Sequence, residues 1–265
     1  METRPLDEPP PGIRAERHSS ALRVVLDKPG RRNAIDAPML TFLGAALDVA
    51  VADPEVHCLT LSGVGDFCAG ADIAWLAEHV KGPEDWAAWL DLLSGTVQRL
   101  DQCPLPLIAA VPGYAVGGGL ELVLAADVVV ASEEARLGDG HVRNNFVPGG
   151  GSSFRLERRV SPASARYLLL TGRLLPAAEA RTRGLVDEVV PADDLDGTVR
   201  GYEEGFGRAQ RPLLIRLKRL QGRREQAWSG TGWALERLVV EAALAEGSAG
   251  AAIDQFSGRS GTTNA

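Results

Sequence analysis

The sequence predicts an α/β fold in which short strands alternate with helices around a layered core. Apolar segments of five to eight residues recur between longer helix-like segments through the first two thirds of the chain. The clearest, LIAAV at residues 107–111, is wholly apolar and follows a proline, as expected of a parallel strand buried on both faces. With 265 residues, 45% of them hydrophobic, the chain is long enough for one large core.

In the first half of the chain, two aspartates are placed to cap helices. Asp36 precedes an apolar-periodic run, and Asp72 follows a loop of small residues. A glycine triplet at 117–119 leads into a further helix. Strands are therefore expected at residues 21–27, 56–63, 107–111 and 127–132, and helices at 37–52, 73–80, 86–100 and 120–125.

The last third of the chain is expected to be mostly helical. One strand is expected at 185–190, and helices at 162–170, 177–183, 195–209, 212–227 and 233–245. The proline-rich start and the Gly/Ser-rich end have no apolar periodicity. We accordingly divide the chain into a disordered lead-in (1–17), an α/β core (18–192), a helical C-terminal region (193–257) and a frayed tail (258–265).

Composition excludes several classes of partner. A net charge of −7 opposes nucleic acid as the main partner, since phosphate binding needs a basic face. The longest apolar stretch contains Glu121 and Asp127, which a membrane span would not carry, and the first residues lack the apolar segment of a signal peptide. Three cysteines without C-x-x-C spacing predict neither disulfides nor a metal site. We expect a soluble cytoplasmic protein without a metal.

Two loops of small residues, 67–72 and 113–119, each follow an apolar strand and open a helix. Glycine and alanine let the backbone approach a ligand closely, and a helix start supplies oriented N–H groups that stabilise negative charge. Tight turn packing is the other explanation of either loop. Glu121 lies one helical turn after Gly118 among leucines and valine, so it needs a salt-bridge partner or has a raised pKa, which suits a general acid or base.

These segments together resemble the enoyl-CoA hydratase/isomerase family, also called crotonases. The resemblance covers about residues 22–191. It rests on four motifs in order: GVGDFCAGADI, LIAAVPGYAVGGGLELVLAADVVVAS, VPGGGSSFRL and LLTGRLLPAAEARTRGLVDEVV. It implies a spiral of ββα units with a helical C-terminal oligomerisation region, which agrees with the expected elements. Periodicity alone does not distinguish this fold from a doubly wound sheet.

The resemblance also implies a site for a thioester. In the family, two backbone N–H groups hold the thioester oxygen of an acyl-CoA and stabilise the enolate; by motif position these belong to Ala71 and Gly118. Residues 28–34 resemble the family's CoA-contacting loop, and 69–73 the loop around adenine and pantetheine. The substrate contacts expected from these loops and from the acyl pocket are Arg31, Arg32, Ala34, Ala69, Asp72, Ile73, Trp86 and Phe146. A solvated basic turn for the arginines and core packing for Trp86 are the alternatives.

One catalytic position departs from the family pattern. Family hydratases use two glutamates; Glu121 matches the first, but His141 occupies the position of the second. An imidazole exchanges protons near neutral pH, so it can replace a carboxylate in that role.

The expected function is that of an acyl-CoA hydro-lyase in which Glu121 and His141 handle the water and the α-carbon proton. The alternatives are an enoyl-CoA isomerase with one base, hydrolytic cleavage of a C–C or thioester bond in an acyl-CoA or β-diketone, and an acyl-CoA-binding subunit without catalysis. The segment before VPG resembles relatives that cleave β-diketones, but those carry histidine and aspartate where this chain has Gly119 and Gly150. No cofactor is expected beyond the CoA of the substrate, and the family implies a homotrimer or a dimer of trimers.

Overall fold

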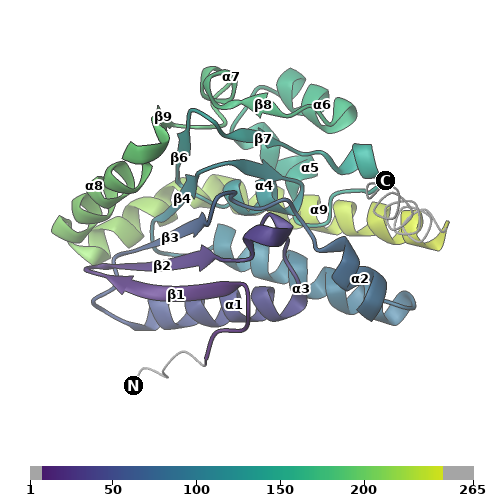
Figure 1. Cartoon of the computed structure of the whole chain (residues 1–265), viewed down its shortest axis with the longest axis horizontal. Coiled ribbons are helices and arrows are strands. Elements are labelled where there is room, and N and C mark those ends of the chain that lie inside the picture. The colour runs from purple at the N-terminus through teal and green to yellow at the C-terminus, as the bar shows by residue number, and fades with distance from the viewer. Residues whose placement is uncertain (1–7, 247–265) are drawn as a thin grey trace.

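A computed structural model describes residues 8–246 of the chain, apart from the side chains of 222–229 (Figure 1). Within that range the main sheet has the order β1-β2-β3-β4-β6-β9, with β1 antiparallel to β2 and every other neighbouring pair parallel. Its strands are β1 (Ile13–His18), β2 (Ala21–Leu26), β3 (Cys58–Gly63), β4 (Leu107–Val111), β6 (Val128–Ser132) and β9 (Glu188–Val190). A smaller sheet contains β5 (Tyr114–Val116), β7 (Arg136–Gly138) and β8 (Leu175–Pro176).

The helices follow the strands in the alternation that the sequence predicts. Asp36 and Asp72 each accept a hydrogen bond from the backbone N–H three residues on, which caps α1 and α2 as expected. The helices are α1 (Ala37–Ala52), α2 (Ile73–His79), α3 (Pro83–Asp101), α4 (Gly118–Val123), α5 (Ser152–Arg155), α6 (Pro162–Thr171), α7 (Ala177–Thr182), α8 (Leu195–Arg208) and α9 (Arg211–Ala245), with 3-10 turns η1 (Pro29–Arg31), η2 (His141–Asn144), η3 (Leu156–Arg158) and η4 (Ala192–Asp194).

The central strand β4 of the main sheet is buried on both faces. In β4, Leu107, Ala109 and Val111 pack into the large core that contains α1 and α3, whereas Ile108 and Ala110 pack against α8 on the other face. Figure 1 shows α8 beside the sheet and α1 and α3 along its other side. This two-sided burial explains why LIAAV has no polar position.

The two small-residue loops meet between the sheets. Isolated parallel bridges join Ile35 to Ala71 and Cys68 to Ala115, so the loop after β3 lies against the strand that leads into the glycine triplet. A β-carbon on Gly119 would lie 2.1 Å from the carbonyl oxygen of Cys68. Glycine is therefore required there for the two loops to approach each other.

Three expectations for the elements need correction. Residues 13–17 belong to β1 and not to a disordered lead-in, because their backbone pairs along the whole of β2. The helices expected at 212–227 and 233–245 are one helix, α9, which continues through Gly230 and Gly232. The strands β5, β7 and β8 were not expected, since two or three residues are too few to show periodicity. The remaining lead-in up to residue 7 and the tail at 258–265 lie outside the described residues.

Among residues 8–246, no helix has the length and apolar character that crossing a membrane requires. In the same range no group of three or more His, Cys, Asp or Glu side chains is arranged to hold a metal ion.

Candidate active site

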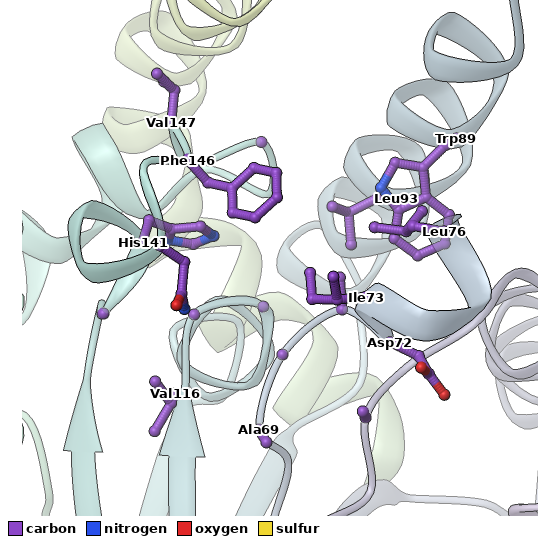
Figure 2. A pocket seen from close by; sticks show the side chains of 18 of the residues that line it. Ala69, Asp72, Ile73, Leu76, Trp89, Leu93, Val116, His141, Phe146 and Val147 are labelled. Carbon is purple, nitrogen blue, oxygen red and sulfur yellow. The ribbon is translucent and has the colours of Figure 1, made fainter. Parts of the chain in front are cut away.

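A cavity of about 410 Å³ opens where the two loops meet. Figure 2 shows His141 and Phe146 on one side of it, Leu76, Trp89 and Leu93 on the other, and Ile73 between them. Val240, Ala243 and Leu244 of α9 complete the apolar part of the wall. A cavity of this size with apolar walls and few polar groups suits a small organic ligand.

Two backbone amides in the cavity wall donate to no acceptor among the described residues. Ala71 and Gly118 both line the cavity, and a β-carbon on Gly118 would lie 3.6 Å from the Ala71 nitrogen. Gly118 is the first residue of α4, so its N–H has no partner within the helix. Among the described residues, neither amide donates to a backbone oxygen of another element. Both N–H groups are therefore available to a ligand in the cavity.

His141 is held in the wall by a buried carboxylate. Its Nδ1 lies 3.0 Å from Asp139 Oδ2, and its backbone N–H donates to Oδ1 at 3.2 Å. The hydroxyl of Ser152 also donates to Asp139. Burial by itself disfavours the imidazolium, but the hydrogen bond and charge of Asp139, together with the charges of Glu121 and Glu236, raise the pKa of His141 to about 9.

The other ring nitrogen of His141 faces the glycine triplet at 117–119, which we call the glycine bend. A β-carbon on Gly117 would lie 3.6 Å from both Cε1 and Nε2 of the imidazole. The Nε2 atom therefore lies close to Gly117, the residue directly before Gly118. An imidazolium in this place can give a proton to a ligand whose oxygen sits on the two amides.

Glu121 is fully buried beneath this wall, and it is absent from the described residues that line the cavity. Its Oε1 accepts hydrogen bonds from the backbone N–H of Gly150 at 2.7 Å and of Ser152 at 3.3 Å. Oε2 has no partner among the described residues. Burial is the main cause that raises the pKa of Glu121, and the His141 charge opposes it.

Gly150 leaves the space that Glu121 needs. A β-carbon there would lie 2.4 Å from Oε2, so we expect Gly150→Ala to displace the carboxylate. Overpacking of this kind costs about 1–3 kcal/mol of unfolding free energy. Urea unfolding measures that cost. Gly197→Ala in α8 is the matched control, because no atom lies within 4 Å of a β-carbon there; equal unfolding free energies in the two variants would contradict the prediction.

The structure brings eleven of the twelve predicted site residues into the cavity wall, and only Glu121 lies behind it. The wall includes Arg31, Arg32, Ala34, Ala69, Ala71, Asp72, Ile73, Trp86, Gly118, His141 and Phe146.

Two of the predicted contacts also have partners in the protein. Asp72 caps α2 and accepts a hydrogen bond from Lys28 Nζ at 2.8 Å, and Figure 2 shows its carboxylate turned away from His141. The guanidinium of Arg32 lies 4.9 Å from the centre of the Tyr114 ring, at an exposed position.

Sequence reasoning missed several residues of the wall. The most important is Asp139, which orients His141. Its signal was available in the segment Asp139-Gly140-His141, because a left-handed glycine (φ 69°) turns the chain and brings the acid back onto the imidazole. Trp89, three residues after the predicted contact Trp86 on α3, is also in the wall. The contribution of Val240 and Leu244 depends on where α9 folds back, which no local pattern shows.

Comparison with known proteins agrees with this geometry. The sequence profile of a family described as enoyl-CoA hydratase/isomerase matches residues 16–219. The chain belongs to the enoyl-CoA hydratase/isomerase family. A probable enoyl-CoA hydratase of Rhizobium meliloti is 34% identical over 223 residues, which cover 84% of this chain and 85% of the relative. Enoyl-CoA hydratase EchA19 of Mycobacterium tuberculosis is 38% identical over 188 residues, or 68% and 69% of the two chains.

Solved structures of the family show the same fold. An enoyl-CoA hydratase/isomerase from Xanthobacter autotrophicus superposes with a TM-score of 0.80 at 27% identity, over 94% of this chain and 98% of that one. An enoyl-CoA hydratase from Mycobacterium avium subsp. paratuberculosis gives a TM-score of 0.81 at 26% identity, over 91% and 99%. The crotonase fold expected from the resemblance is thereby confirmed, and the chain is a hydratase-like enzyme of this family.

Proposed function

We propose that the protein is an acyl-CoA hydro-lyase that adds water reversibly to the double bond of a 2-enoyl-CoA. The observation that carries this proposal is the pair of unused amides, Ala71 and Gly118, in one apolar wall with an imidazole beside them. A thioester oxygen bound there gains negative charge when water adds at the β-carbon, and oriented N–H groups stabilise that enolate.

The two ionisable groups then balance the protons. Glu121 as carboxylate takes a proton from water while the hydroxide bonds to the β-carbon, and the double bond's electrons move into the thioester as an enolate. The His141 imidazolium gives its proton to the α-carbon, which restores the thioester. The enzyme is left with a protonated glutamate and a neutral imidazole, and a proton returns from the first to the second before the next turnover.

Glu121 needs water at its free oxygen in this mechanism. Oε2 is buried and has no partner in the part of the chain that the structure describes, and a bound water would supply the missing hydrogen bond. Oε1 is held by two backbone amides, so the carboxylate points in one fixed direction. These contacts support the assignment of Glu121 as the group that activates water.

The cavity suits the two halves of an acyl-CoA. Arg31 and Arg32 are exposed on the wall where the CoA-contacting loop is expected, and they can meet its phosphates. Trp86, Trp89 and Phe146 enclose the opposite, apolar part, which we assign to the acyl group.

The Asp139–His141 pair favours hydrolytic cleavage as a second candidate. An imidazole oriented by a buried carboxylate also activates water for attack at a carbonyl. This chemistry needs neutral His141 at the start, whereas the pKa of about 9 keeps it protonated at neutral pH. Hydration starts from the imidazolium and so fits this protonation state of His141.

An assay with crotonyl-CoA in deuterated water tests the proposal. We expect loss of the conjugated thioester absorbance and one deuterium at the α-carbon, with no free thiol. Glu121→Gln keeps the size of the side chain but cannot take a proton, so turnover should fall by about 10²–10⁴. Release of free CoA would favour hydrolysis instead, and deuterium uptake with the double bond retained would favour isomerisation.

We also propose that the protein forms a homo-oligomer. Leu235, Leu238 and Val239 are exposed apolar side chains on α9, in the region where the family's helical assembly contacts are expected. They support a homotrimer or a dimer of trimers.

A further inference from the structure

A second buried glutamate, Glu236, lies on α9 at the back of the site, 5% exposed. It lines a small cavity of about 80 Å³ that shares Leu90, Gly149 and Val240 with the acyl cavity. Glu236 takes no part in the proposed hydration steps.

The turn at 150–153 divides its amides between two carboxylates. Gly150 and Ser152 donate to Oε1 of Glu121, while Gly151 donates to Oε1 of Glu236 at 2.7 Å and Ser153 to Oε2 at 3.1 Å. The Ser153 hydroxyl also donates to Glu236. Successive N–H groups thus alternate between α4 and α9, and neither carboxylate can move without pulling on the turn that holds the other.

The packing of α9 leaves this turn little freedom. A β-carbon on Gly232 would lie 2.6 Å from the Phe154 ring, and one on Gly151 would lie 2.9 Å from the Trp233 ring. The Phe154 and Trp233 rings are edge to face, with centroids 5.1 Å apart. The helix that carries Glu236 is therefore packed against Gly151 within the shared turn and against Phe154 directly after it.

We propose that Glu236 is a positioning residue for Glu121, which it fixes by holding the two amides of the 150–153 turn that Glu121 leaves free. The inference rests on the proposed role of Glu121 in activating water. Its structural part, the mechanical link between two carboxylates, is independent of the reaction.

The charges around the pair add an electrostatic link. Burial, and next the charge of Glu121, raise the pKa of Glu236 to about 7, so the two carboxylates resist being ionised together. The other charged groups that interact with them are His141 and Asp139 from the β7–η2 segment and Arg155 from α5. Asp101 of α3 is paired with Arg155 at 3.3 Å. Removing the Glu236 charge should therefore favour ionised Glu121 and neutral His141.

Hydrogen–deuterium exchange of the free protein tests the mechanical link. In Glu236→Gln we expect faster exchange at all four amides of residues 150–153, including the two that bind Glu121. Faster exchange at Gly151 and Ser153 alone, or at none of the four, would overturn the proposal. Ser153→Ala removes only one donor to Glu236 and should give a smaller increase in exchange at the same four amides. This second variant tests the link even if Glu236→Gln does not fold.

Kinetics with crotonyl-CoA test the link to catalysis. Displacement of a reacting group by about 1 Å costs up to about 10²-fold, so we expect Glu236→Gln to lower kcat by about 10–100-fold. KM should stay within about threefold, because no substrate contact is lost. Both limbs of the kcat/KM profile should move to lower pH. An unchanged profile, or equal loss in the control Glu241→Gln on the exposed side of α9, would contradict the catalytic part.

The two measurements separate the two proposals. If exchange shows the four amides linked but the wild-type protein does not hydrate crotonyl-CoA, the positioning role stands and the proposed reaction fails. If hydration depends on Glu121 while exchange shows independent amides, the reaction stands and the role of Glu236 fails.

Discussion

Replacing His141 by glutamine is expected to lower kcat for hydration of crotonyl-CoA by about 10²–10⁴, the contribution of a positioned acid or base. Glutamine can still donate a hydrogen bond to the Asp139 carboxylate, but it cannot carry a proton to the α-carbon. The imidazole lies beside the glycine bend and not beside residues 28–34, where CoA is expected to bind. We therefore expect little change in KM. Initial rates from the thioester absorbance provide the measurement.

His79→Gln is the matched control for this variant. His79 is exposed on α2, where its ring stacks on Trp75 at 4.4 Å, and it does not line the cavity described above. Its replacement should leave kcat unchanged. If His141→Gln keeps wild-type turnover, the two-residue mechanism is wrong and the one-base isomerase becomes the better description.

The same histidine sets the alkaline limb of activity. The folded-state pKa of about 9 lies above the ordinary value of 6.5, so His141 stays protonated until the pH rises through about 9. Hydration should lose rate over that range. Water addition consumes no net proton, so kcat/KM for dehydration of the 3-hydroxyacyl-CoA must show the same limb. A limb near 6.5 in both directions would show that Asp139 does not stabilise the imidazolium.

The sequence predicted the elements that have their own local signals. Asp36 and Asp72 were recognised as caps because a capping carboxylate acts within three residues, and LIAAV was recognised because burial on both faces leaves no polar position. The short strands β5, β7 and β8 carry no such signal. They pair with one another across long stretches of the chain, so their pairing depends on the whole fold.

Apart from Glu121, the site residues that were predicted from recognisable sequence motifs line the cavity. The amides of Ala71 and Gly118 belong to loops whose small residues are visible in the sequence, and His141 was placed by counting from the family pattern. The burial of Glu121 behind the wall was not visible, because it depends on which amides of the 150–153 turn reach its carboxylate. Glu236 is 115 residues away in sequence and meets the same turn only through the return of α9.

Removing the Gly118 N–H should have an effect comparable to loss of the histidine. Gly118 is the first residue of α4, where proline is well tolerated, and a β-carbon there meets no atom closer than 3.5 Å. Gly118→Pro therefore deletes one donor to the thioester oxygen with the helix start preserved. Loss of one such donor costs about 10²–10³ in kcat.

The matched variant Gly118→Ala separates the hydrogen bond from side-chain bulk. Alanine adds the β-carbon but keeps the N–H, so kcat should stay within about threefold of wild type while the proline variant shows the loss of about 10²–10³. Calorimetric binding of free CoA should be equal in both, because the expected CoA contacts lie on other loops. If alanine and proline reduce kcat equally, the loss comes from crowding of the glycine bend, and the Gly118 amide does not stabilise the enolate.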